Sequence, residues 1–168
     1  ARQGVAVCLL AANAVFAAEI WDPVTRSWTL GARNAENRTY HSSSILLTNG
    51  TVLTAGGGAP GAVNHLNADI YYPPQLFRTV GGRAELAPRP VLQAITSLNG
   101  AYGGALGLRL DAASASTTIS QVSLIALGNT THGYNTSQRR VPLSFTRAGD
   151  TISANLPANA NLAPPGYY

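Results

Sequence analysis

The sequence of 168 residues contains no lysine and no methionine, and it contains a single cysteine, Cys8. One cysteine cannot form an intrachain disulfide framework, so disulfides are excluded as the basis of the fold. Only 11% of the residues are charged, and the eleven arginines that give the net charge of +4 are scattered, apart from Arg139 and Arg140. Because no basic stripe with interleaved aromatic residues is present, we expect no nucleic-acid partner. The apolar run at residues 5–15 is too short to span a bilayer, so we expect no membrane partner.

Several common kinds of active site are also absent from the sequence. Aspartate and glutamate are few and scattered, no glycine-rich phosphate loop precedes a helix, and no Ser-His-Asp arrangement is visible. The run at 5–15, followed by Phe16-Ala17-Ala18, has the form of a signal-peptide core with a small-residue cleavage site. The alternative is a truncated or misread start, because the sequence passes directly into a strand pattern. Residues 1–13 are therefore unassigned.

What is abundant is Gly, Pro, Ser, Thr, Asn and Ala, which favours many short strands joined by turns, and so an all-β fold. Residues 19–28 read as a hairpin around Asp22-Pro23, and residues 40–47 and 52–56 as a second strand pair around Asn49-Gly50. Four strands in about 40 residues, ending in three glycines, match one blade of a β-propeller. One blade needs neighbours to bury its faces, and no second copy is visible, so we expect the chain to be incomplete.

The second half of the sequence predicts a small Ig-like sandwich. Residues 64–77 contain Tyr71-Tyr-Pro-Pro74 and read as an extended connector. After it come five strand patterns separated by turn residues, where an Ig-like fold has about seven: 91–96, 105–110, 121–127, 141–146 and 151–156. The predicted organisation is an unassigned start at 1–13, a propeller repeat with connector at 14–77, and a C-terminally truncated Ig-like domain at 78–168.

Three histidines are candidates for chemistry, namely His41, His65 and His132, and Tyr40 stands beside the first. In a strand, Tyr40 and His41 would point to opposite faces, so both could serve one site only at a strand end or a bulge. The alternative is structural: Tyr40 packs in the blade, and each histidine is hydrogen-bonded to the backbone.

Five motifs bear on this choice by resemblance, in an order and spacing that also agree. They are residues 38–47 (RTYHSSSILL), 49–52 (NGTV), 56–58 (GGG), 64–70 (NHLNADI) and 128–143 (GNTTHGYNTSQRRVPL). Together they resemble the galactose oxidase and glyoxal oxidase family of copper radical oxidases. The resemblance covers residues from about Ala14 to Tyr168, and its most specific part is Thr131-His132 with the following Asn-Thr-x-Gln-Arg-Arg.

The resemblance implies a kelch propeller followed by an Ig-like early-set domain, one loop of which reaches the copper. It implies that His41 and His132 are imidazole ligands of Cu²⁺ and that Tyr40 is the axial tyrosine ligand, which also acts as the catalytic base. Neutral imidazoles suit Cu(II), and a phenolate can accept the proton of an alcohol. His65 matches a position that is not a ligand and is expected to be structural. Gln138, Arg139 and Arg140 are expected to support the loop that carries His132.

The family's activity is oxidation of primary alcohols or aldehydes, carbohydrates included, by O₂ to give hydrogen peroxide. It uses a second tyrosine cross-linked to a cysteine, and nothing in this sequence matches that pair, since Cys8 lies outside the resemblance. We therefore expect a part of a secreted copper radical oxidase that is inactive alone and binds copper weakly. The alternatives are a non-catalytic kelch and Ig-like module, carbohydrate-binding or structural, and a gene fragment that never acts by itself.

Overall fold

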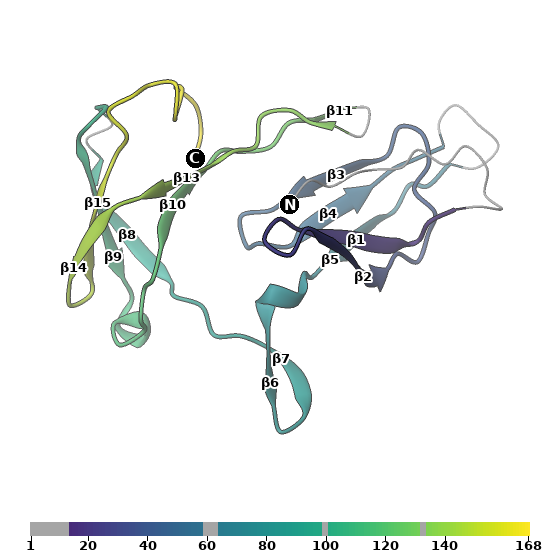
Figure 1. Cartoon of the computed structure of the whole chain (residues 1–168), viewed down its shortest axis with the longest axis horizontal. Helices are drawn as coiled ribbons and strands as arrows, with labels where there is room; N and C mark the ends of the chain where they lie inside the picture. Colours follow the sequence, from purple (N-terminus) through teal and green to yellow (C-terminus); the bar gives the residue numbers. More distant parts are fainter. Residues whose placement is uncertain (1–13, 59–63, 99–100, 132–133) are drawn as a thin grey trace. The chain divides into compact units, whose positions relative to one another are not determined.

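The computed structural model describes residues 14–58, 64–98, 101–131 and 134–168, and Figure 1 traces the chain. Regular structure in these ranges is almost entirely β-strand, which confirms the predicted all-β class. The chain forms two compact units. The first unit runs to Ala87 and includes Gly128–Ser137, and the second unit comprises Pro88–Leu127 and Gln138–Tyr168. The sequence placed a domain boundary after residue 77, ten residues before the end of this compact unit. In the described residues, no helix is long and apolar enough to cross a membrane.

The first unit begins with a hairpin of β1 (Ala17–Asp22) and β2 (Ser27–Arg33), as the Asp-Pro signal predicted. The Asp22 carboxylate accepts hydrogen bonds from the backbone N–H of Val24 at 2.8 Å and of Thr25 at 3.4 Å. These bonds favour the ionised carboxylate, so the pKa of Asp22 lies below its ordinary value. A local side-chain contact therefore closes this turn.

A second sheet contains β3 (Ser43–Leu46), β4 (Val52–Ala55) and β5 (Ala68–Tyr71), all antiparallel in that order. The predicted Asn-Gly turn joins the first two strands. Asn49 Oδ1 accepts hydrogen bonds from the backbone N–H and the hydroxyl of Thr51, at 3.0 and 2.6 Å, and Gly50 takes the positive φ of 80°. The predicted strand pair is confirmed, except that residues 40–42 precede β3 and form a turn instead.

The four strands predicted to form one blade are divided between these two sheets, since no ladder joins β2 to β3 in the part of the chain that the structure describes. Tyr71 of β5 nevertheless packs against β2. A Cβ atom added to Gly31 would lie 2.5 Å from the Tyr71 hydroxyl oxygen, so the absence of a side chain at Gly31 makes room for the ring. That hydroxyl is buried without a hydrogen-bond partner among the described residues, and burial raises the pKa of Tyr71.

The segment predicted as an extended connector contains β5 and is followed by a short 3-10 helix, η2 (Pro74–Leu76). A two-stranded sheet of β6 (Phe77–Val80) and β7 (Arg83–Leu86) follows and is the last element of the first unit before Ala87. Its turn uses Gly81 and Gly82 with φ of 56° and 79°. The short strands β11 (Thr130–Thr131) and β12 (Tyr134–Asn135) also belong to the first unit.

The second unit is a two-sheet sandwich. One sheet has the order β14-β15-β9-β8, the other pairs β10 with β13, and a 3-10 turn, η3 (Ala112–Ser114), follows β9. The strands are β8 (Leu92–Leu98), β9 (Ala105–Leu110), β10 (Val122–Ile125), β13 (Arg140–Leu143), β14 (Phe145–Ala148) and β15 (Thr151–Asn155). Leu108, Leu110 and Ile152 form the buried core of the larger sheet, and Val122 of the smaller sheet packs against it.

All five predicted sandwich strands are present, but the one predicted at 141–146 is divided at Ser144 into β13 and β14, which join different sheets. Asn155 of β15 holds the point of division. Its backbone N–H donates to the Ser144 carbonyl at 2.9 Å, and its side-chain amide donates to the Ser144 hydroxyl at 2.9 Å. A strand that changes sheets is a common way to build the corner of a sandwich.

Candidate metal centre

Tyr40 and His41 lie in the middle of a tight turn before β3. The backbone N–H of Ser42 donates to the carbonyl of Thr39 at 3.1 Å, and His41 has a φ of 66°. This backbone places the two rings side by side, with centroids 3.8 Å apart and planes tilted by 32°. The sequence required a strand end or a bulge for both side chains to serve one site, and this turn meets that condition. The Tyr40 side chain is exposed to solvent.

The three glycines after β4, Gly56–Gly58, contact the backbone of this turn. The backbone N–H of Gly58 donates to the carbonyl of Tyr40 at 2.7 Å. A Cβ atom on Gly57 would lie 3.0 Å from the backbone nitrogen of Thr39, and all three glycines have positive φ. Glycine at these positions therefore permits a close approach of two backbones.

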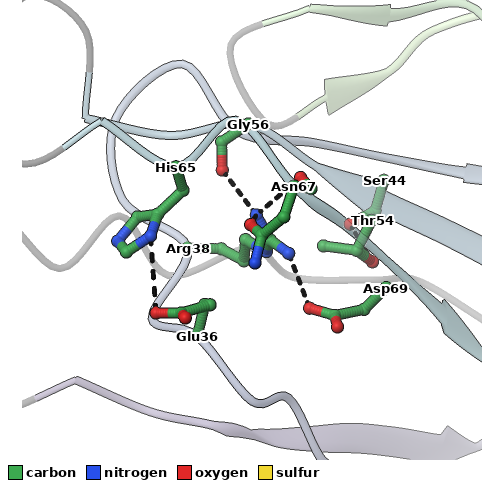
Figure 2. A network of polar contacts seen from close by, with 8 residues as sticks. All are labelled: Glu36, Arg38, Ser44, Thr54, Gly56, His65, Asn67 and Asp69. Atoms are coloured by element: carbon green, nitrogen blue, oxygen red, sulfur yellow. Dashed lines mark hydrogen bonds and ion pairs between the residues drawn. The ribbon is translucent and has the colours of Figure 1, made fainter.

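Arg38 joins the turn to the end of the β3-β4-β5 sheet (Figure 2). Its Nη1 donates to the Gly56 carbonyl at 3.1 Å, the Asn67 carbonyl at 3.1 Å and Asn67 Oδ1 at 2.9 Å. Its Nη2 forms an ion pair with Asp69 at 2.6 Å, and the arginine side chain is only 5% exposed. Sequence reasoning did not single out Arg38. The signal was its place at the start of the Arg-Thr-Tyr-His motif, but its partners are distant in sequence.

His65 contacts the same glycine run. Its backbone N–H donates to the Gly57 carbonyl at 3.0 Å, and its Nδ1 lies 3.4 Å from a carboxylate oxygen of Glu36 (Figure 2). Its Nε2 is buried without a hydrogen-bond partner among the described residues. These contacts suit the structural role that the sequence predicted for His65.

His132 lies outside the described residues, but the chain on both sides of it is described. Thr130–Thr131 and Tyr134–Asn135 pair as β11 and β12, and the Thr130 hydroxyl donates to the Ser44 carbonyl of β3 at 3.1 Å. Ser44 follows His41 by three residues. The hairpin that contains position 132 therefore contacts the strand that leaves the Tyr40–His41 turn.

The predicted supporting residues follow this hairpin and belong to the second unit. Arg139 Nη1 donates to the carbonyls of Asn161 and Leu162 at 3.3 and 3.4 Å, and Arg140 Nη2 donates to Gln121 Oε1 at 2.9 Å. Gln138 stands directly before them. Both arginines thus fix the chain where it returns from the hairpin to the sandwich.

The donor atoms of the turn fit copper. A phenol oxygen and an imidazole nitrogen project from one tight turn, and Cu(II) favours such O and N ligands in tetragonal geometry. In the described ranges, no three His, Cys, Asp or Glu side chains gather closely enough to hold a metal ion. Tyr40 and His41 offer two donor atoms from one turn.

Comparison with known proteins shows the class of the second half of the chain. Residues 89–168 match the family described as "Galactose oxidase-like, Early set domain". The sandwich of the second unit is therefore an Ig-like early-set domain of the galactose oxidase type, as predicted.

Relatives extend the similarity to almost the whole chain. It is 36% identical over 157 residues to a galactose oxidase of Gibberella zeae and 27% identical over 173 residues to a WSC domain-containing protein of Arthroderma benhamiae. These matches cover 92% and 100% of this chain but only 22% and 18% of the relatives. A solved structure described as a "novel fungal alcohol oxidase with catalytic diversity among the AA5 family, in complex with copper" aligns with a TM-score of 0.76 and 30% identity. The aligned region spans 90% of this chain and 31% of the solved chain. The chain thus fits the C-terminal part of a galactose oxidase-like copper radical oxidase, which confirms the predicted resemblance.

Proposed function

We propose that this chain is part of a secreted copper radical oxidase that oxidises primary alcohols or aldehydes, carbohydrates included, with O₂ to give hydrogen peroxide. In this proposal, Tyr40, His41 and His132 are its contribution to the copper site. The observation that carries the proposal is the turn in which Tyr40 and His41 lie with ring centroids 3.8 Å apart. His41 holds a left-handed φ of 66°, a strained conformation that the surrounding contacts must maintain and that recurs at functional sites.

Each residue has a distinct role in the proposal. His41 and His132 hold copper through neutral imidazole nitrogens. The exposed Tyr40 phenolate accepts the proton of the substrate hydroxyl, as a general base does. Copper, when bound, would supply a one-electron oxidant. The contact between Thr130 and Ser44 supports convergence of the two ligand-bearing segments.

The test is a Cu(II) titration of the purified chain followed by electron paramagnetic resonance, with His41→Ala and His132→Ala as test variants. His65→Gln is the matched control, since this third histidine has its own contact with Glu36. We expect a tetragonal signal with nitrogen coupling that both alanine variants abolish and the control preserves. A signal indifferent to both alanine substitutions would refute the ligand assignment.

Oxidase activity and tight copper binding are not expected of the chain alone, because the sequence offers no match to the cross-linked Tyr-Cys pair. Sub-micromolar affinity for Cu(II) would contradict this. The second candidate function is a non-catalytic kelch and Ig-like module, for carbohydrate binding or structure. One relative is named for a WSC domain and not for an oxidase, and a wild-type copper signal that does not depend on His41 would leave this module as the better account.

A further inference from the structure

We infer that Arg38 is a positioning residue that sets the geometry of the Tyr40–His41 turn. The inference rests on the proposed copper function, because it concerns the same two ligands. Arg38 is separated from Tyr40 by one residue, and its guanidinium bonds to Gly56 after β4 and to Asp69 in β5 (Figure 2). It therefore acts on the site through the backbone.

The Tyr40–His41 turn needs support from outside itself. His41 adopts a left-handed φ of 66°, which disfavours residues with a side chain. The turn's own bond is a single contact between Ser42 and Thr39 at 3.1 Å. A strained backbone of this kind persists only when its surroundings over-determine it.

This support comes from the glycine run Gly56–Gly58. Gly58 donates a backbone hydrogen bond to the Tyr40 carbonyl at 2.7 Å, so the position of the turn follows the position of the glycine run. Three consecutive glycines with positive φ have no side chains to fix them. The run must itself be held by residues outside it.

Arg38 in turn holds the glycine run. Its guanidinium donates to the Gly56 carbonyl, while its other bonds go to Asn67 and Asp69 at the start of β5. A planar fork of donors can bridge these groups at fixed angles, which a lysine ammonium cannot do. With its side chain 5% exposed and paired to Asp69, the arginine is shielded from competing water. Arg38 thereby links the chain before the turn to the glycines that clamp the turn.

The test is Arg38→Lys in the full chain, measured by amide hydrogen exchange at Ser42 and Gly58, whose N–H groups donate within and onto the turn. Loss of charge-assisted hydrogen bonds should accelerate exchange at both amides by about 10- to 100-fold. The copper spectrum of this variant should lose or alter its nitrogen coupling. Asp69→Asn is a milder second variant in case the lysine variant does not fold, and it should give a smaller effect of the same kind.

The matched control is Thr54→Val, which removes the side-chain hydrogen bond to Ser44 at 3.0 Å in the same sheet. It should leave exchange at Ser42 and Gly58 and the nitrogen coupling unchanged. Unchanged exchange at both amides in Arg38→Lys and Asp69→Asn would overturn the inference. If the wild-type copper signal does not depend on His41, the proposed function fails instead, and the exchange data still decide whether Arg38 sets the turn.

Discussion

Replacing Gly57 with alanine should disrupt the candidate site through the backbone alone. Gly57 has a φ of 119°, which side chains rarely adopt, and such strain costs about 1–3 kcal/mol. The added Cβ would also lie 3.0 Å from the backbone nitrogen of Thr39, which cannot rotate away. Forcing an extra methyl group into a packed site costs about 1–3 kcal/mol more. We therefore expect a total destabilisation of about 2–6 kcal/mol.

Gly81→Ala is the matched control for this prediction. Gly81 has a φ of 56°, but a Cβ added there meets nothing within 4 Å. Only the left-handed backbone term of about 1–2 kcal/mol applies to it. The difference between the two variants therefore reports the close approach of Gly57 to Thr39 together with the greater backbone strain at its φ of 119°.

The assay is urea unfolding followed by tryptophan fluorescence. The chain has two tryptophans, and both lie in the first unit, Trp21 in β1 and Trp28 in β2, with ring centroids 5.3 Å apart. Their signal therefore reports the unit that contains the turn. Equal unfolding midpoints for Gly57→Ala and Gly81→Ala would refute the reasoning, because they would mean that the turn does not need the glycine run at this distance.

Two further predictions concern parts of the structure away from the turn. Tyr71→Phe should leave stability unchanged at neutral pH or raise it by up to about 1–3 kcal/mol, because it removes a buried hydroxyl without a partner among the described residues. Since burial raises the pKa of Tyr71 above 10.0, the folded state holds its proton longer than the unfolded state does. Wild-type stability should therefore fall as pH rises above the ordinary tyrosine pKa, and the phenylalanine variant should lack this part of the loss in urea unfolding at alkaline pH. Leu110→Ala should destabilise the sandwich by about 2–5 kcal/mol by opening a cavity beside Leu108 and Ile152, whereas Leu66→Ala, at a side chain that is 99% exposed, should change little in circular-dichroism melts.

The strands and turns were predictable from the sequence because their signals are local. Asp22 and Asn49 bond to backbone groups two or three residues away, so the residues that close these hairpins stand beside the strands they join. The division at Ser144 was not predictable in this way. It depends on which distant strands pair with β13 and β14, and the alternating pattern is the same on both sides. The separation of the predicted blade into two sheets has the same cause, since a pattern shows strands and not their ladders.

Sequence motifs identified residues of the candidate site, but they did not predict its geometry. Tyr40 and His41 were assigned by resemblance, but a strand pattern gives no reason to expect a histidine at positive φ. Arg38 was missed because its partners are remote: the Gly56 carbonyl is 18 residues away and Asp69 is 31 residues away. An arginine in a sparsely charged sequence suggests a solvated side chain, and only the fold shows that this one is buried and paired.

Two non-glycine residues in the described part of the chain, Arg26 and His41, have positive φ, and they differ in what their side chains offer. Arg26, with a φ of 54°, lies in the exposed turn between β1 and β2, where reversal of the chain accounts for its conformation. A glycine at position 26 would satisfy that turn equally well. A glycine at position 41 would also relieve the strain, but it would remove the only side-chain nitrogen among residues 39–42. Positive φ alone therefore does not mark a functional residue, and what a glycine could not replace in the proposed site is the imidazole beside Tyr40.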